Sequence, residues 1–214
     1  MPNLPEIYIQ QIVGNSIIES VDLFPLAYED GALPDREATQ LLALLLYANP
    51  RAVLEIGTFF GATTVRMAHQ LPNAIIHTVD LPFAGQFDQN PLLTDFHLIN
   101  RRSVGREFLK RPNFTNIRQH FADTMTFDFQ LAKNAEFFFI DGSHSYNYVK
   151  NDSDKCFELC NGSGFFVWHD AAPSHPSVLK LLEDWRYLLG RNIFRLSYTA
   201  LAFLDARELL FTRK

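Results

Sequence analysis

The chain has 214 residues, of which 47% are hydrophobic and 20% charged, and its formal net charge is −5. This length suits one globular domain with a substantial core. The acidic balance, without a block of lysine and arginine, argues against nucleic acid as the main partner. No apolar stretch has the roughly 18 uncharged residues that a membrane span requires. The first residues, MPNLPE, do not resemble a signal peptide, so we expect a cytoplasmic protein with a small-molecule partner.

Apolar runs along the chain predict an α/β fold. Residues 1–50 include the helical stretch Glu37–Tyr47 and are expected to form an N-terminal helical cap. From residue 52 onward, short apolar runs alternate with amphipathic stretches, which is typical of a mostly parallel sheet covered by helices on both faces. We predict strands over 52–57, 74–80, 116–121, 135–141 and 164–169, and helices over 61–71, 104–110 and 145–160.

The last third of the chain carries a strong helical pattern and a hairpin pattern. Apolar residues repeat at helical spacing from Val178 to Leu189, and Gly190 is placed to end this helix. The runs 193–196 and 200–204 are too close together for a crossover helix, so they should pair as an antiparallel hairpin. Cys156 and Cys160 lie four residues apart in the predicted helix over 145–160, where buried thiols are expected.

A long polar and aromatic insert at residues 81–103 follows the second predicted strand. Inserts at strand ends of such sheets often cover a binding site, so this segment is a candidate lid. A structural segment without a binding role explains the insert equally well. We treat residues 1–214 as a single domain.

The first predicted strand ends in a loop with two glycines. Glu55, Gly57 and Gly61 form the pattern ExGxxxG, whereas a dinucleotide site would show GxGxxG with helix amides aimed at a pyrophosphate. The Glu55 carboxylate would repel a pyrophosphate but suits a positively charged ligand, such as the ammonium and sulfonium of S-adenosyl-L-methionine. The spacing resembles motif I of the class I S-adenosylmethionine-dependent methyltransferases. An ordinary strand-to-helix turn remains the alternative.

Other acids lie where the predicted strands end, which is where parallel sheets bind ligands. Asp80 lies 25 residues beyond Glu55, close to the spacing at which an acid accepts hydrogen bonds from ribose hydroxyls. Asp123 resembles the family position that contacts the adenine. The predicted cofactor-binding residues are Glu55, Gly57, Thr58, Gly61, Asp80, Leu81, Ala122, Asp123 and Asp141.

A second motif follows the fourth and fifth predicted strands. Asp141-Gly142-Ser143-His144-Ser145-Tyr146 and His169-Asp170 resemble the DGxHxY and HD elements of small bacterial class I methyltransferases, over most of residues 50–205. This family is similar to the metal-dependent sugar O-methyltransferases of macrolide biosynthesis. The resemblance implies that Asp141 and Asp170 hold a divalent cation and that His144 is the general base, so the predicted catalytic residues are His144 and Asp141.

One position departs from that pattern. His169 stands where the first acid of a metal-binding pair is expected, and we count it as a third candidate ligand. Magnesium prefers oxygen ligands, whereas imidazole suits manganese, zinc or iron better. A structural role for His169 explains the residue as well. The cation is therefore Mg²⁺ or Mn²⁺ if one binds.

These patterns together predict a Rossmann-like, doubly wound, mostly parallel seven-stranded sheet with a C-terminal antiparallel hairpin. The predicted function is O-methylation of a small hydroxylated acceptor, a sugar or a natural-product intermediate. The oligomeric state stays open, with a homodimer as one candidate. Two alternatives remain: a nicotinamide-dependent oxidoreductase, and a non-catalytic protein that binds S-adenosylmethionine.

Overall fold

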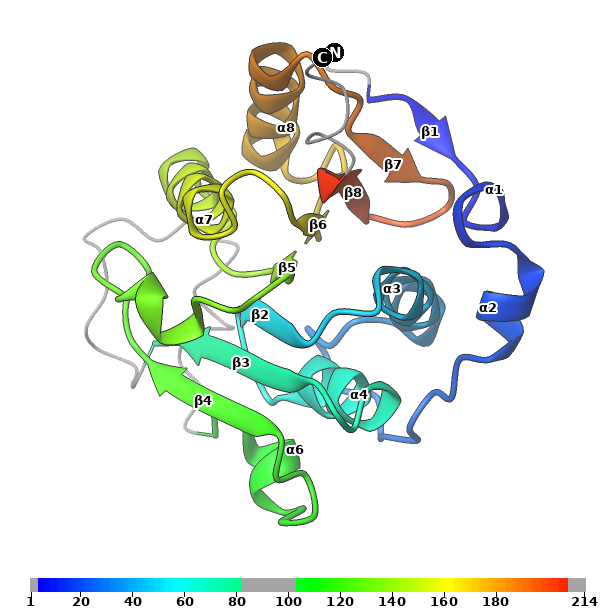
Figure 1. The fold of residues 1–214 in the computed structure, drawn as a ribbon, viewed down its shortest axis with the longest axis vertical. Helices are drawn as coiled ribbons and strands as arrows, with labels where there is room; N and C mark the ends of the chain where they lie inside the picture. The colour runs from blue at the N-terminus through cyan, green and yellow to red at the C-terminus, as the bar shows by residue number, and fades with distance from the viewer. Residues whose placement is uncertain (1–3, 82–102, 208–214) are drawn as a thin grey trace.

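One eight-stranded sheet forms the centre of the computed structural model, which describes residues 4–81 and 103–207 (Figure 1). Its strand order is β1-β7-β8-β6-β5-β2-β3-β4. The five strands from β4 to β6 are mutually parallel, whereas β8 runs antiparallel to both β6 and β7. The strands are β1 (Glu6–Ile7), β2 (Ala52–Ile56), β3 (Ile75–Asp80), β4 (Ile117–Phe121), β5 (Phe137–Ile140), β6 (Phe165–Trp168), β7 (Phe194–Leu196) and β8 (Ala202–Asp205).

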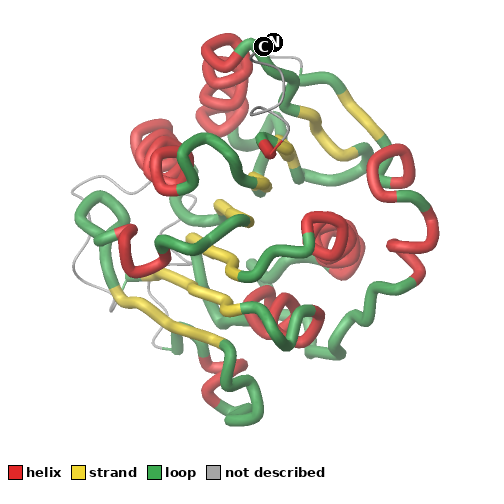
Figure 2. The backbone as a smooth tube through the Cα atoms, in the orientation of Figure 1, coloured by secondary structure: helices red, strands yellow, loops and turns green. Residues whose placement is uncertain are grey.

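Helices cover both faces of this sheet, as Figure 2 shows. The helical elements are α1 (Gln10–Val13), α2 (Asn15–Glu19), α3 (Asp35–Ala48), α4 (Ala62–Gln70), α6 (Arg106–Leu109), the 3₁₀ turn η1 (Phe129–Ala132), α7 (Tyr146–Leu159) and α8 (Pro176–Leu189). Helices α3 and α4 lie on one side of the central strands, and α7 and α8 lie on the other (Figure 1).

Successive side chains of the central strands pack alternately into two separate hydrophobic cores. Phe138 packs in the core shared with α7 and α8, whereas Phe137 and Phe139 pack in the core shared with α3 and α4. All four residues of β5 and of β6 are buried. A strand that is covered on both faces has a continuous apolar sequence. This explains why apolar runs in the sequence predicted these strands well.

The predicted Rossmann-like doubly wound fold is confirmed, with one strand more than the seven expected. The added strand, β1, pairs in parallel with β7 at the sheet edge. It has only two residues, so it leaves no alternation of apolar and polar residues to detect. The region 1–50 therefore contributes α1, α2 and α3 and also extends the sheet.

The C-terminal elements agree closely with the sequence pattern. Helix α8 ends at Gly190, whose φ of 60° is left-handed, and β7 and β8 form the expected antiparallel hairpin. The helix predicted over 104–110 is shorter, a single turn at α6. Cys156 is buried and Cys160 partly buried, and both thiols are free. The candidate lid at 81–103 lies almost entirely outside the described residues.

The chain order reverses between β2 and β5, because β3 and β4 extend to one side of β2 and β5 and β6 to the other. Ligands of open α/β sheets bind beyond the carboxyl ends of the strands at such a switch point. Gly57 follows β2 there and Asp141 follows β5. Among the described residues, no helix is long and apolar enough to cross a membrane.

Candidate functional site at the carboxyl ends of the strands

The glycine loop after β2 touches the end of β5. Gly57 has a φ of +97°, and a Cβ atom built on it would lie 2.0 Å from the carbonyl oxygen of Asp141. No side chain fits in that space, so glycine is required by backbone packing as well as by backbone angle. Gly61 also has a positive φ, and its close neighbour is the Phe108 ring of α6. The loop therefore holds β2, β5 and α6 together at the switch point.

Glu55 lies at the base of this loop and is fully buried. Its Oε2 accepts hydrogen bonds from the hydroxyls of Thr64 (2.5 Å) and Thr78 (2.6 Å), and Thr78 in turn contacts the hydroxyl of Thr58 (2.6 Å). Its Oε1 is buried and has no hydrogen-bond partner among the described residues. Burial raises the pKa of Glu55 to about 8, although the two threonine hydrogen bonds act to lower it. A buried acid with one unpaired oxygen thus lies at the base of the loop.

Asp80 ends β3 beside the same loop. Its carboxylate accepts hydrogen bonds from the backbone amides of Phe59 (2.8 Å) and Leu81 (2.7 Å). Burial raises the pKa of Asp80, against the lowering effect of these amides. Each carboxylate oxygen has a second lone pair, so Asp80 can still accept hydrogen bonds from a ligand's hydroxyls. The predicted residues Thr58, Asp80 and Leu81 are thus brought together with the glycine loop.

Asp123 lies one strand further along the edge. The backbone of Ala122 donates to the carbonyl of Asp80 (2.9 Å), which fixes this turn beside β3. The Asp123 carboxylate accepts from the Met125 amide (2.9 Å) and from the Tyr148 hydroxyl (3.1 Å). Tyr148 comes from α7, so this contact joins the turn after β4 to the helix that follows β5. The strand-end acids from β2 to β5 therefore share one edge of the sheet.

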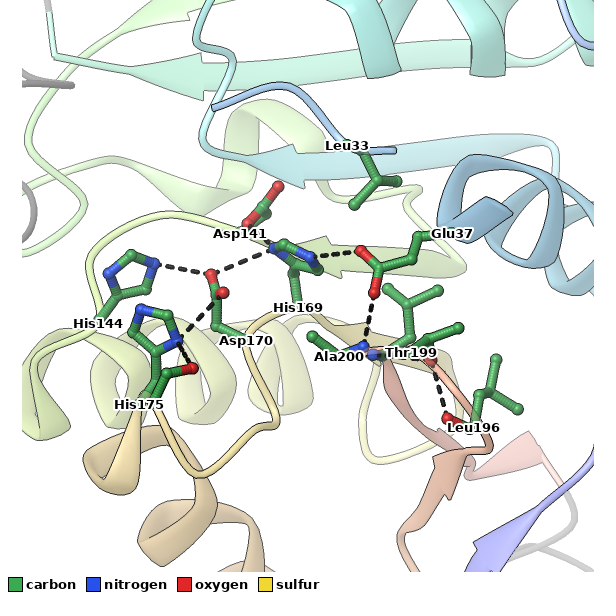
Figure 3. A network of polar contacts seen from close by, with 12 residues as sticks. Leu33, Glu37, Asp141, His144, His169, Asp170, His175, Leu196, Thr199 and Ala200 are labelled. Atoms are coloured by element: carbon green, nitrogen blue, oxygen red, sulfur yellow. Dashed lines mark hydrogen bonds and ion pairs between the residues drawn. The ribbon is translucent and has the colours of Figure 1, made fainter. Parts of the chain in front are cut away.

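His144 and Asp170 form a close pair at the other half of that edge, shown in Figure 3. The Nε2 atom of His144 lies 2.7 Å from Oδ2 of Asp170, and Nδ1 of His175 lies 3.3 Å from Oδ1 of the same carboxylate. Burial acts to raise the pKa of Asp170, but the hydrogen bonds with His144 and His169 hold it well below its usual range. Asp170 also has a left-handed φ of 56°, a strained backbone state that clusters at functional sites.

His169 bridges two carboxylates from distant parts of the chain. Its Nδ1 lies 2.9 Å from Oδ1 of Asp141, and its Nε2 lies 2.9 Å from Oε2 of Glu37 in α3. Figure 3 shows the ring between these two side chains. Burial acts to lower the pKa of His169, but the Asp141 carboxylate and the other acidic partners raise it well above its ordinary value. The acidic surroundings of His169 therefore favour its protonated form.

The observed donor set allows a test of the predicted metal site. Ligand atoms of Asp141, His169 and Asp170 lie within 4.8 Å of one another. Two of these residues are carboxylates, which suit Mg²⁺ and Mn²⁺, and the third is an imidazole, which suits Mn²⁺ better than Mg²⁺. Nε2 of His169 faces Glu37, and an outer carboxylate of this kind orients a metal-binding histidine through its other ring nitrogen. The donor set therefore fits a divalent cation, which Asp141, His169 and Asp170 would hold.

Two residues of this cluster, Glu37 and His175, did not emerge from the sequence as site residues. Glu37 lies in the first turn of a mostly apolar helix. Acids are common there because the helix dipole stabilises negative charge near the N-terminus. His175 directly precedes Pro176 at the start of α8. The only available signal was the position of each residue at a helix start. Of the predicted residues, Asp141, His144, His169 and Asp170 do lie in one cluster.

Comparison with known proteins adds a family assignment. The family model Methyltransf_24, described as a methyltransferase domain, matches residues 54–171. That span runs from β2 to the residue after Asp170 and so contains every predicted site residue. A search of curated proteins finds no significant match.

Several solved methyltransferase structures share the fold at low sequence identity. TomG of Streptomyces achromogenes, an O-methyltransferase of tomaymycin synthesis solved with S-adenosylmethionine, is 15% identical to this chain. The match covers 81% of this chain and 80% of TomG with a TM-score of 0.55. PaMTH1 of Podospora anserina, solved with S-adenosylhomocysteine, is 16% identical over 81% of this chain and 79% of its own, at a TM-score of 0.55.

A third structural neighbour carries a different methyltransferase activity in its name. The precorrin-6y C5,15-methyltransferase of Geobacter metallireducens is 14% identical, with 74% of this chain and 75% of that chain covered and a TM-score of 0.54. Identities this low establish the fold alone. The acceptor atom must therefore be argued from the side chains of the site.

Proposed function

The chain belongs to the methyltransferase-domain family, and on that premise we propose that it transfers the methyl group of S-adenosylmethionine to a hydroxyl oxygen of a small molecule. The observation that carries the choice of oxygen is the His144–Asp170 pair, 2.7 Å apart, beside Asp141 at the switch point. The acceptor class that we propose is a sugar or a hydroxylated natural-product intermediate.

The proposed binding of S-adenosylmethionine is supported by residues at the carboxyl ends of β2, β3 and β4. Asp80 would accept hydrogen bonds from the ribose hydroxyls, and Asp123, at the next strand end, would contact the adenine. The unpaired Oε1 of Glu55 is a buried oxygen that a cationic ligand would stabilise. TomG and PaMTH1, which share the fold, were solved with S-adenosylmethionine and S-adenosylhomocysteine, and this supports the same donor here.

The proposed role of His144 as the base follows from the chemistry of a hydroxyl group. A hydroxyl is a poor nucleophile until its proton is removed, and a positioned histidine can contribute about 10²- to 10⁴-fold by taking that proton. With a hydrogen on Nε2 donated to Asp170, the lone pair of His144 lies on Nδ1, which would accept the acceptor's proton. The carboxylate then stabilises the imidazolium that forms, as in other histidine–carboxylate pairs.

The methyl transfer itself is an in-line displacement. The acceptor oxygen forms a bond to the methyl carbon as the carbon–sulfur bond breaks, and the bond electrons return to sulfur. The products are a methyl ether, S-adenosylhomocysteine and one proton on His144. Most of the remaining rate advantage comes from holding the two reactants in line. A divalent cation held by Asp141, His169 and Asp170 would further favour the alkoxide form of the acceptor.

Two measurements test the proposal. Calorimetry should show binding of S-adenosylhomocysteine, and mass spectrometry with a deuterated methyl donor should show transfer to a hydroxylated acceptor. The absence of cofactor binding would contradict the proposal. The family match argues against the oxidoreductase alternative. Cofactor binding with no transfer to any member of a broad hydroxyl library would favour the non-catalytic alternative.

A further inference from the structure

Helix α7 holds the turn that follows β4, which carries the proposed adenine residue. The hydroxyl of Tyr148 donates to Oδ2 of Asp123 over 3.1 Å, and the backbone amide of Met125 donates to Oδ1 over 2.9 Å. Each carboxylate oxygen thus has one protein donor and keeps a further lone pair for a ligand. Because the two donors reach different oxygens from different elements, they fix the direction in which the carboxylate points.

The same helix holds the turn at a second point. Asn151 lies three residues after Tyr148, so both side chains share one face of α7. The Nδ2 atom of Asn151 donates to the backbone carbonyl of Thr124 (3.0 Å) and to Oδ1 of Asp152 (3.1 Å). Asp152 is only 1% exposed, so this amide is oriented from inside the protein. The turn is therefore fastened to α7 on both sides of the bond between Asp123 and Thr124.

The chemistry of adenine makes the direction of this carboxylate important. The exocyclic amino group of adenine donates hydrogen bonds, whereas the ring nitrogen beside it accepts them. Hypoxanthine reverses this pattern, because it has a carbonyl oxygen in place of the amino group and a hydrogen on that ring nitrogen. A fixed carboxylate facing the amino group would repel the carbonyl oxygen. A carboxylate that is free to turn can accept from the N–H group of hypoxanthine instead, so discrimination requires that it be fixed.

We propose that Tyr148 is a positioning residue that acts through Asp123 and sets the specificity of the site for the adenine base. This inference deepens the proposed function and rests on it, since that function supplies the cofactor. The Tyr148 hydroxyl holds the carboxylate towards the exocyclic amino group, and Asn151 holds the turn against α7. Because α7 begins two residues after His144, one helix supports both the proposed base and the adenine turn.

The test compares two ligands by calorimetry: S-adenosylhomocysteine and S-inosylhomocysteine, which carries hypoxanthine in place of adenine. The wild-type chain should bind the adenine ligand about 10²-fold more tightly or better. Tyr148→Phe keeps the ring and removes only the hydroxyl, and it should lower this ratio about 10-fold or more, the effect of one hydrogen bond to a charged group. Tyr146→Phe is the matched control, since the Tyr146 hydroxyl donates to Asp184 of α8 (2.7 Å), and it should leave the ratio unchanged.

The ratio of the two affinities separates this role from a structural one. A contact that only stabilises the turn would, when lost, weaken both ligands by the same factor, so an unchanged ratio in Tyr148→Phe overturns the inference. In an Asp123→Ala background, Tyr148→Phe should lower the ratio no further, and a further fall would show that Tyr148 does not act through Asp123. Urea unfolding checks that each variant is folded. Tyr148→Leu also lacks the hydroxyl and takes the place of Tyr148→Phe if that variant does not fold.

The same titrations distinguish failure of the inference from failure of the proposed function. If the wild-type chain bound neither ligand, the proposed function would be contradicted and the role of Tyr148 with it. If the wild-type chain bound S-adenosylhomocysteine but Tyr148→Phe kept the wild-type preference for adenine, only the role of Tyr148 would be wrong.

Discussion

His144 Nε2 and Asp170 Oδ2 lie 2.7 Å apart, although 26 residues separate them along the chain. His144 follows β5 and Asp170 follows β6, and these two strands are parallel neighbours. The contact therefore forms because the sheet brings two strand ends together. It couples the proposed base to a carboxylate that the surrounding histidines keep ionised.

Replacing Asp170 should slow methyl transfer without weakening cofactor binding. In Asp170→Asn, the side chain no longer supplies the charge that stabilises the His144 imidazolium, so we expect kcat to fall by about 10²- to 10⁴-fold. Steady-state kinetics should show the loss in kcat, with an unchanged dissociation constant for S-adenosylhomocysteine. Asp184→Asn is a suitable control, because Asp184 pairs with Tyr146 away from this carboxylate. An equal loss in both variants would contradict the role of Asp170.

Replacing Asp80 should weaken cofactor binding. Asp80→Ala removes the acceptor for the ribose hydroxyls, and hydrogen bonds to a charged group are worth about 1.5–3 kcal/mol, so the dissociation constant should rise about 10- to 150-fold. Calorimetry with S-adenosylhomocysteine measures this change. Asp22→Ala, at an exposed carboxylate that contacts His69, should leave the affinity unchanged. Unchanged binding in Asp80→Ala would remove Asp80 from the cofactor site.

Gly57 should tolerate no side chain. In Gly57→Ala the new Cβ would meet the Asp141 carbonyl oxygen at 2.0 Å, so the strand ends must separate. We expect a loss of about 3 kcal/mol or more in the free energy of unfolding, measured with urea. Gly14→Ala is a matched control, since Gly14 also has a positive φ but has nothing within 4 Å of a built Cβ. That control should cost only the backbone strain of its φ of 74° and ψ of 163°, about 1–3 kcal/mol. Equal losses would mean that the close approach is unimportant.

The buried acid Glu55 should make stability depend on pH. Its pKa is raised from 4.5 to about 8 in the folded chain, so the unfolded chain releases this proton first. The protonated form stabilises the fold below pH 4.5, and this contribution is lost as pH rises from 4.5 to about 8. Without ligand, the wild-type chain should lose stability relative to Glu55→Gln across that range, by a few kcal/mol at about 1.4 kcal/mol per pKa unit. A stability difference that is constant with pH in urea titrations would contradict this assignment.

The sequence predicted most of the fold because buried parallel strands appear as uninterrupted apolar runs. Each run also stops at a polar residue, so apolar spacing alone could place Asp80, Asp141 and His169-Asp170 at one sheet edge. Strand β1 was not predicted, because a strand of two residues is too short to show an alternation of apolar and polar residues. The shorter α6 reflects a local pattern that continues beyond the single turn that packs against Gly61.

The contacts of Glu37 could not be predicted in the same way. Its hydrogen bond with His169 spans 132 residues and depends on how α3 packs on the sheet. Apolar spacing identifies the buried face of α3, but it does not say which strand end the first turn reaches. The second acidic partner of His169 was hidden for the same reason, because it comes from this helix.

The most direct test of the proposed function compares the wild-type chain with His144→Gln, using a deuterated methyl donor and a library of hydroxylated small molecules. We predict a methyl ether product for the wild-type chain and about 10²- to 10⁴-fold slower transfer for His144→Gln, with S-adenosylhomocysteine binding retained in both. Transfer to carbon or nitrogen, or transfer at the wild-type rate by His144→Gln, would contradict the account.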